Sequence, residues 1–280
     1  MVQMNPESKF ANANGINLHY LDWGGDGPPV VMVHASSFCA DVWGPIAESL
    51  SQRYHSMAID QRGHGRSDKP PGPYAWENFG QDLSGFIEAL GLKDVIAIGH
   101  STGGTHVLLA AANKPGLISK AVVFEPTIWS HDDWHGMARR NADWVRRRRP
   151  IWDSREQAFK SFRPRSPFGT WREDIVRAYV QGGFEDLPDG RVALGCPPEI
   201  EAELYENVSN LDPKKHLPSI TCPVLWIVGG YSHPMQKAMM ERGAGLVKSC
   251  RLLYISGTGH FIPMDKPEES LAVILQFLSA

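Results

Sequence analysis

The chain has 280 residues, of which 42% are hydrophobic and 21% are charged, and its formal net charge is −3. This composition is typical of a globular protein with a large core, and the charge balance argues against nucleic acid or an anionic membrane as a partner. The first residues lack the apolar core of a signal peptide and no run of 18 apolar residues occurs, so we expect a cytoplasmic protein without a membrane span.

Short apolar strand patterns alternate with amphipathic helical patterns along most of the chain. The predicted strands cover residues 16–22 at the sheet edge, 30–33, 55–60, 95–98, 120–124, 224–228 and 251–255. The predicted helices of this part cover 43–50, 79–90, a run from 105, about 234–247 and about 267–278. Between about 127 and 217 only helical patterns occur, roughly at 133–149, 154–163, 171–182 and 198–208. We therefore predict an α/β fold with a mostly parallel sheet, flanked by helices and interrupted by one helical insertion.

A G-x-S-x-G turn at Gly99–Gly103 joins a predicted buried strand to a helical run. A serine on so sharp a turn is held in a strained conformation that pushes its hydroxyl out of the sheet, and glycines leave room for the turn to close. The following helix directs free N–H groups at the same point, where they would stabilise an oxyanion. Ser101 is therefore predicted to be a nucleophile, against the alternative of a chance pattern in a loop.

Polar residues follow the ends of several predicted strands, namely His34, Asp60, Ser101, Glu125 and His260. Ligands of open parallel sheets bind outside the carboxyl ends of the strands, so these residues should line one edge, with the insertion above them. A hydroxyl nucleophile needs a base, and His260 in its glycine-rich loop is the best candidate.

Four motifs in this order resemble those of the α/β-hydrolase superfamily: His34-Ala35, Asp60–Ser67, Gly99–Gly104 and Gly259–Glu269. The resemblance covers about residues 12–126 and 218–280, and it implies an α/β-hydrolase fold with a core of 1–126 and 218–280 and a helical cap at 127–217. It also implies Ser101 as nucleophile and His260 as general base and later general acid. The Asp60–Ser67 run is expected to shape a turn. No metal-ligand spacing such as H-E-x-x-H occurs, and we expect neither a metal nor a cofactor.

The resemblance further implies an oxyanion hole made of two backbone N–H groups. Thr102, which follows the nucleophile, supplies one of them. The other comes from the loop after the strand at 30–33, where this chain has Ala35 in place of the usual glycine. The donor there is Ser36, with Ser37 as the open alternative.

The acid of the triad is where the chain departs from the family pattern. Members commonly place an Asp after the strand equivalent to 224–228, where this chain has Ser232. A second arrangement takes the acid from the end of the strand before the cap, which is Glu125 here. We predict a Ser101–Glu125–His260 triad. The alternatives are that Glu125 only anchors the cap hinge and that Asp265 or Asp212 supplies the acid.

Many aromatic residues of the insertion are expected to pack the cap or to form an apolar pocket over the catalytic edge. The run Arg146–Arg149 would point all round a helix, so we favour a solvated cap surface over steering of an anionic substrate. The four cysteines are widely spaced, which indicates buried free thiols, although Cys39 could be reactive. The residues expected to contact substrate are His34, Ser37, His100 and Trp129.

These features predict a serine hydrolase that cleaves an apolar or aromatic carboxylic ester or lactone through an acyl-enzyme. The position of Glu125 is similar to that in lactonases of the superfamily, and Ser101 argues against the dehalogenases and epoxide hydrolases, which use an Asp nucleophile. Carbon–carbon bond hydrolysis and perhydrolase or acyltransferase chemistry stay open. So does a small-molecule receptor with little turnover, for which Ser232 would mark a decayed triad. The expected partner is a small molecule, and a homodimer is left open.

Overall fold

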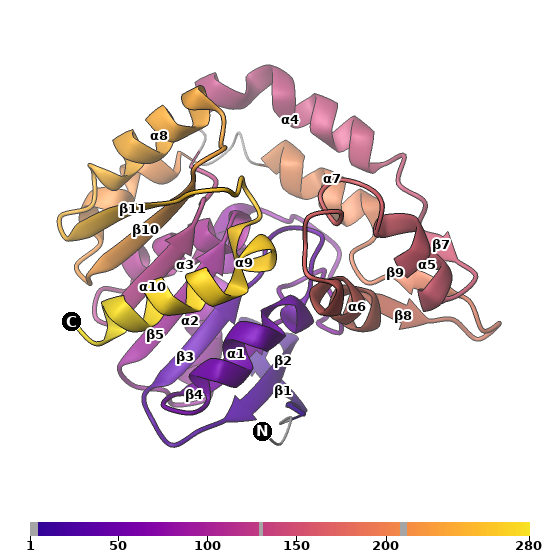
Figure 1. Cartoon of the computed structure of the whole chain (residues 1–280), viewed down its shortest axis with the longest axis horizontal. Coiled ribbons are helices and arrows are strands. Elements are labelled where there is room, and N and C mark those ends of the chain that lie inside the picture. Colours follow the sequence, from indigo (N-terminus) through magenta and orange to yellow (C-terminus); the bar gives the residue numbers. More distant parts are fainter. Residues whose placement is uncertain (1–4, 129–130, 208–211) are drawn as a thin grey trace.

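The computed structural model describes residues 5–128, 131–207 and 212–280, and its centre is an eight-stranded sheet (Figure 1). β1 and β2 form an antiparallel hairpin, β2 pairs antiparallel with β4, and the remaining neighbours are parallel. The mostly parallel sheet is therefore confirmed. In sheet order the strands are β1 (Glu7–Ala13), β2 (Ile16–Gly24), β4 (His55–Ile59), β3 (Pro29–Val33), β5 (Val95–His100), β6 (Ile118–Phe124), β10 (Val224–Gly229) and β11 (Cys250–Ile255).

The edge of the sheet differs from the prediction. We expected the strand at 16–22 to be the edge strand, but β1 pairs with it and occupies the edge instead. β1 is polar and mostly accessible, so it carries little apolar periodicity. Its turn residues Asn14 and Gly15 both have positive φ, 49° and 77°, as a tight hairpin turn requires.

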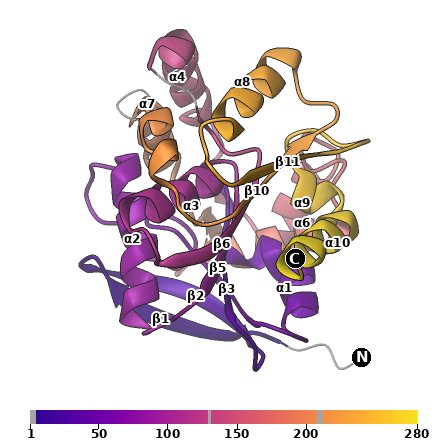
Figure 2. The ribbon, with the colours of Figure 1, turned by 90° about the vertical axis from the view of Figure 1, so that its left-hand side faces the viewer.

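Helices cover both faces of the sheet and bury alternate strand residues. On β5, Ile96 and Ile98 pack in the core beneath α1 (Gly44–Leu50) and α10 (Pro267–Leu278). Val95 and Ala97 face the opposite core beneath α2 (Trp76–Ala89), α3 (Thr102–Asn113) and α8 (Pro234–Ala244). Figure 2 shows the sheet between α1 and α10 on one side and α2 and α3 on the other. Two short helical segments, η1 (Ala40–Trp43) and α9 (Ile262–Asp265), precede α1 and α10.

The described residues between β6 and β10 form four α-helices, of which α4 and α7 run above the core in Figure 1, and two short 3-10 helices, η3 (Pro213–Lys215) and η4 (Leu217–Ser219). This insertion also holds a small antiparallel sheet, β7-β9-β8, so the expectation of helices and loops alone was wrong. These strands have only two or three residues, too few to show a period in the sequence. The bounds are α4 (His131–Val145), β7 (Ile151–Trp152), α5 (Arg155–Phe162), α6 (Glu173–Gly182), β8 (Phe184–Asp186), β9 (Val192–Leu194) and α7 (Pro198–Asn207). No helix in the described ranges is long and apolar enough to cross a membrane.

The loop after β4 is held in place by buried polar contacts, in agreement with the predicted turn-shaping role. Asp60 is fully buried, and its carboxylate accepts hydrogen bonds from the backbone N–H groups of Ala40 at 2.7 Å and Arg66 at 3.0 Å. The guanidinium of Arg62 makes a two-point ion pair with Asp82 on α2, at 2.5 and 2.6 Å. This pair fixes the loop to the helix beneath it.

Removal of one partner from this buried pair leaves the other charge without a counterion. We expect Asp82→Ala to lower the free energy of unfolding by about 3–5 kcal/mol, as is usual for a broken buried ion pair. Glu88→Ala is the matched control, because Glu88 pairs with Lys114 on the surface of the same helix and exposed pairs contribute at most about 1 kcal/mol. Urea unfolding of both variants measures the difference, and equal losses would contradict a structural role for the buried pair.

Four buried histidines lie beneath the carboxyl edge of the sheet: His34, His64, His100 and His106. Burial disfavours the charged imidazolium and lowers the pKa of each, to about 3 for His64. Burial outweighs the hydrogen bond from Nδ1 of His64 to the carbonyl of Arg62 at 2.9 Å, which by itself would raise the pKa of that ring.

The lowered pKa values predict loss of stability in mild acid. An unfolded histidine takes up a proton near pH ~6.5, whereas the buried ones stay neutral, so the unfolded state binds more protons. Stability is therefore intact above pH ~6.5 and falls below it, by at most about 1.4 kcal/mol per pH unit for each buried histidine. Urea unfolding at pH 7.5, 6.5 and 5.5 measures the slope, which should be smaller in His64→Gln. An identical slope in this variant would contradict the explanation.

Candidate active site

The turn that carries Ser101 is strained in the way its sequence predicts. Ser101 stands between β5 and α3 with φ 53° and ψ −121°, a region that non-glycine residues rarely adopt. A Cβ at position 99 would collide with the carbonyl of Gly103, and a Cβ at position 103 with that of His34. Both positions therefore need glycine, and the strain is imposed by the surrounding backbone.

The structure brings Ser101, His260 and Glu125 together in one hydrogen-bonded chain. The Oγ of Ser101 lies 3.0 Å from Nε2 of His260, and Nδ1 of His260 lies 3.2 Å from Oε2 of Glu125. With its proton on Nδ1, facing the carboxylate, the imidazole leaves Nε2 free to accept the serine proton. These distances are within the reach of a nucleophile, a base and an orienting group.

Glu125 follows β6 in a strained conformation, with φ 44°, and its side chain is fully buried. Burial by itself would raise the pKa of this carboxyl group, but hydrogen bonds from His260, Ser232 and the N–H of Gly229 outweigh burial and lower the pKa below its usual value. Gly229 donates at 2.7 Å and Ser232 at 2.5 Å, both to Oε1. The carboxylate is thus held ionised where it faces the histidine.

Ser232, which occupies the position where family members commonly have an Asp, forms a hydrogen bond with Glu125. Ser232 is buried and donates its hydroxyl to Glu125, so it helps to hold a carboxylate that comes from the neighbouring strand end. Gln236 on α8 donates to Oε2 at 2.6 Å, a contact that no motif or pattern of the sequence indicated. The two weaker alternatives do not contact His260: Asp265 accepts from Thr170 and Thr258, and Asp212 accepts from the N–H of Lys214.

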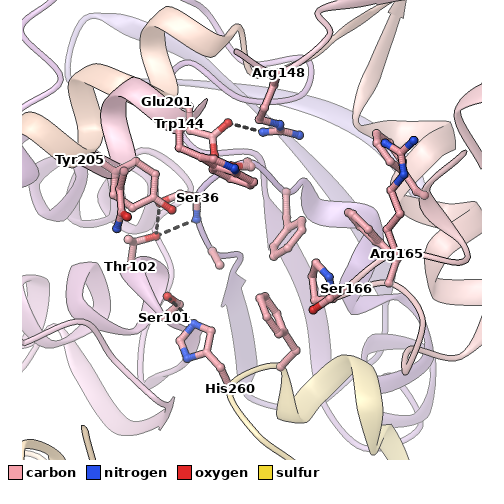
Figure 3. A pocket seen from close by; sticks show the side chains of 18 of the residues that line it. Ser36, Ser101, Thr102, Trp144, Arg148, Arg165, Ser166, Glu201, Tyr205 and His260 are labelled. Carbon is pink, nitrogen blue, oxygen red and sulfur yellow. Dashed lines mark hydrogen bonds and ion pairs between the residues drawn. The ribbon is translucent and has the colours of Figure 1, made fainter. Parts of the chain in front are cut away.

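The two predicted oxyanion-hole residues, Thr102 and Ser36, lie against each other. The N–H of Ser36 donates to Oγ1 of Thr102 at 2.8 Å, and the hydroxyl of Ser36 lies 3.1 Å from the same oxygen (Figure 3). The N–H of Thr102 is at the first position of α3, where an N–H has no acceptor within the helix. Ser37, the alternative donor, also lines the cavity and has φ 71°. A substrate oxygen entering here has to replace the Thr102 hydroxyl at Ser36.

Two of the predicted substrate contacts are wrong, because His34 and His100 are fully buried and do not line the cavity. Nε2 of His34 accepts from the N–H of Gln61 at 3.1 Å, and its Nδ1 donates to the carbonyl of Ala35 at 2.7 Å. Nε2 of His100 donates to the carbonyl of His260 at 2.8 Å. Both rings therefore position loops of the site. Trp129 lies outside the described residues.

A cavity of about 1030 Å³ opens over Ser101 and His260 and is enclosed by the core and the insertion (Figure 3). Thr127, which the sequence did not single out, also lines it, with its hydroxyl 3.4 Å from the Oγ of Ser101. Much of the wall is aromatic, as expected. The aromatic lining residues are Phe38, Trp76, Trp144, Trp152, Phe162, Phe168, Tyr205 and Phe261.

The arginine run is as predicted in one respect and differs in another. Arg146, Arg147 and Arg149 are exposed, as expected of a solvated surface, but the helix expected through residue 149 ends at Val145 and the next residues form a turn. Arg147, Arg148 and Arg149 consequently line the cavity, and Arg148 pairs there with the buried Glu201. The prediction that the arginines point all round a helix was wrong, because α4 ends before them although the helical pattern of the sequence extends to residue 149.

Two other chemistries have little support in the described part of the chain. Cys39 is fully buried outside the cavity, and burial raises the pKa of its thiol well above the usual value, which keeps it unreactive. Residues 5–128, 131–207 and 212–280 contain no cluster of three or more His, Cys, Asp or Glu side chains arranged to hold a metal ion.

Comparison with known proteins gives several matches along nearly the whole chain. The 2-(acetamidomethylene)succinate hydrolase of Mesorhizobium japonicum is 27% identical over 91% of this chain and 90% of that protein. The N-formylmaleamate deformylase of Pseudomonas putida is 25% identical over 95% and 94%. A bifunctional esterase/perhydrolase of Acinetobacter calcoaceticus is 25% identical over 95% and 97%.

A solved structure and a family model agree with these sequence matches. A crystal structure of E-2-(acetamidomethylene)succinate hydrolase superposes with a TM-score of 0.86 at 24% identity, covering 98% of this chain and all of that one. Residues 28–267 match the family described as the alpha/beta hydrolase fold. Because that match includes both strand ends that carry Ser101 and Glu125 as well as the loop of His260, the chain belongs to the α/β-hydrolase family.

Proposed function

We propose that this protein is a serine hydrolase that cleaves a carboxylic ester or lactone through an acyl-enzyme. The observation that carries the proposal is the hydrogen-bonded chain from the Ser101 hydroxyl through His260 to the buried, ionised Glu125. A hydroxyl is a weak nucleophile unless a base removes its proton, and this chain provides the base and the group that orients it.

The reaction follows from these positions. The Oγ of Ser101 attacks the carbonyl carbon while Nε2 of His260 takes the hydroxyl proton, and Glu125 stabilises the imidazolium that forms. The carbonyl electron pair moves onto oxygen, which the N–H groups of Thr102 and Ser36 stabilise. The intermediate collapses, and the leaving alcohol takes the proton from His260. A water molecule then gives a proton to His260 while its oxygen attacks the acyl carbon. The second intermediate collapses, His260 returns the proton to the Oγ of Ser101, and the carboxylic acid leaves.

The cavity supports a substrate of moderate size with apolar parts. Its volume of about 1030 Å³ is at the upper end of small-molecule sites, and aromatic side chains from the core and the insertion form much of its wall. We take residues 127–217 as a cap that closes this space over the core. The name of the esterase/perhydrolase relative includes ester cleavage, which is consistent with the proposal.

A second candidate is hydrolysis of another acyl bond at the same triad. The names of two full-length relatives, a 2-(acetamidomethylene)succinate hydrolase and an N-formylmaleamate deformylase, describe N-acyl substrates. An amine would then leave in place of an alcohol, with the same serine and histidine. Carbon–carbon bond hydrolysis and perhydrolysis are further variants on this triad. A receptor without turnover has less support, because Ser232 holds Glu125 and does not mark a lost acid.

The nucleophile assignment is tested by Ser101→Ala. We expect this variant to lose labelling by a fluorophosphonate probe and to lose turnover by at least ~10³-fold, because the members of a triad act as a unit. Ser166→Ala is the matched control, since Ser166 also lines the cavity but has no base beside it and should leave labelling intact. Retained turnover in Ser101→Ala would disprove the assignment.

The acid assignment is tested by comparing two neighbouring variants. Glu125→Gln keeps the shape of the side chain but removes the charge that stabilises the imidazolium, so kcat/KM should fall by about 10³-fold or more. Ser232→Ala should cost no more than about tenfold, because the Gly229 N–H and Gln236 still donate to the carboxylate. Steady-state kinetics give both values, with circular dichroism to confirm folding. The reverse order of effects would show that the acid comes from elsewhere.

A further inference from the structure

The wall of the cavity carries an excess of positive charge. Four arginines line it, Arg147, Arg148, Arg149 and Arg165, against one acidic residue of the described wall, Glu201. Figure 3 shows Arg148 and Arg165 away from Ser101 and His260, with Arg165 across the cavity from them. These two guanidinium groups therefore lie away from the Ser101 hydroxyl and the His260 ring.

Two of these arginines already have partners within the protein. Arg148 forms an ion pair with Glu201, whose side chain is 3% exposed, and this pair is close to neutral. Arg149 lies over the ring of Trp152, 4.5 Å from its centroid, and its Nε donates to the carbonyl of Ile151 at 2.7 Å. Both guanidinium groups are held in fixed positions and serve as parts of the wall.

The other two have no such partners. Within the described ranges, the guanidinium groups of Arg147 and Arg165 have no hydrogen-bond acceptor, ion-pair partner or aromatic ring beside them. Arg163, two residues before Arg165, differs in this respect, since its guanidinium donates to the carbonyls of Phe168 and Gly169 at 3.1 and 2.8 Å. Arg147 and Arg165 are exposed residues that border the cavity, so their donors are open to a ligand.

We propose that Arg147 and Arg165 form a subsite for a carboxylate at the far end of the acyl substrate. A guanidinium presents planar, paired N–H donors that match the two oxygens of a carboxylate, so each of these open side chains can bind one in a two-point arrangement. The proposal rests on the hydrolase function above and narrows its substrate. The substrate class is an ester or lactone whose carbonyl reaches Ser101 while a terminal carboxylate reaches the arginines.

The kinetic test uses pairs of substrates that differ in one charge. The monomethyl esters of succinate, glutarate, adipate and pimelate are compared with the corresponding dimethyl esters, in which the carboxylate is masked. The quantity measured is the ratio of kcat/KM for the charged ester to that for the neutral ester of equal length. The ratio should be highest at the length that spans the cavity, and Arg147→Gln and Arg165→Gln should each lower it by about tenfold.

Arg140→Gln is the matched control, because it removes the same charge from an exposed position of α4 outside the cavity wall. It should leave the ratio unchanged. An equal fall in Arg140→Gln would assign the effect to the overall field of the protein and overturn the subsite. A ratio that neither wall variant changes at any chain length would overturn it as well.

A binding experiment separates this proposal from the proposed function. Adipate is titrated into Ser101→Ala by calorimetry, which requires no turnover. We expect binding that weakens by about tenfold when Arg165→Gln or Arg147→Gln is added and persists when Arg140→Gln is added. If the wild type neither hydrolyses esters nor reacts with the fluorophosphonate, the hydrolase function fails, while this result still supports the subsite. Absence of binding, or binding that none of the arginine variants changes, overturns the subsite.

Discussion

The buried carboxylate of Glu125 is the interaction on which the candidate site depends. Burial favours its neutral form, and the donors around it reverse that preference. These donors come from the end of β10, from α8 and from the loop of His260, so one carboxylate joins three segments that are far apart in sequence. Without them burial would raise the pKa of this carboxyl group and disfavour the charge that stabilises a histidinium.

The register of the sheet explains how the acid can come from β6. Phe124 on β6 pairs with Ile227 on β10, so Glu125 and Gly229 leave the sheet at neighbouring points of the same edge. A carboxylate from either strand can therefore reach the same imidazole. Ser232 then fills the position that an Asp commonly has, and it contributes a hydrogen bond to the acid from the adjacent strand.

Much of the fold and the placement of the triad residues could be predicted because each depends on local patterns. Ser101 and Glu125 directly follow the buried strands β5 and β6, His260 lies in the loop after β11, and parallel strands end at one edge. The same rule misplaced the side chain of His34, because it locates the backbone and does not give the direction of a side chain. The sequence did not predict β1 or the short strands of the insertion, because β1 is polar and strands of two or three residues are too short to show an alternation of apolar residues. Helix ends are poorly marked by propensity alone, so the end of α4 at Val145 and the direction of the arginines after it could not be predicted.

In the proposed oxyanion hole, the contact between Ser36 and Thr102 competes with a substrate oxygen for the N–H of Ser36. The N–H of Ser36 is already satisfied by the Thr102 hydroxyl, so a neutral carbonyl oxygen gains little by taking its place. A fully charged oxygen is a much stronger acceptor and wins the exchange. Ground-state binding is thereby weakened relative to binding of the tetrahedral intermediate, and this difference is what accelerates a reaction. In this proposal, the Thr102 hydroxyl makes the N–H of Ser36 selective for the charged oxygen of the intermediate over the neutral carbonyl oxygen of the substrate.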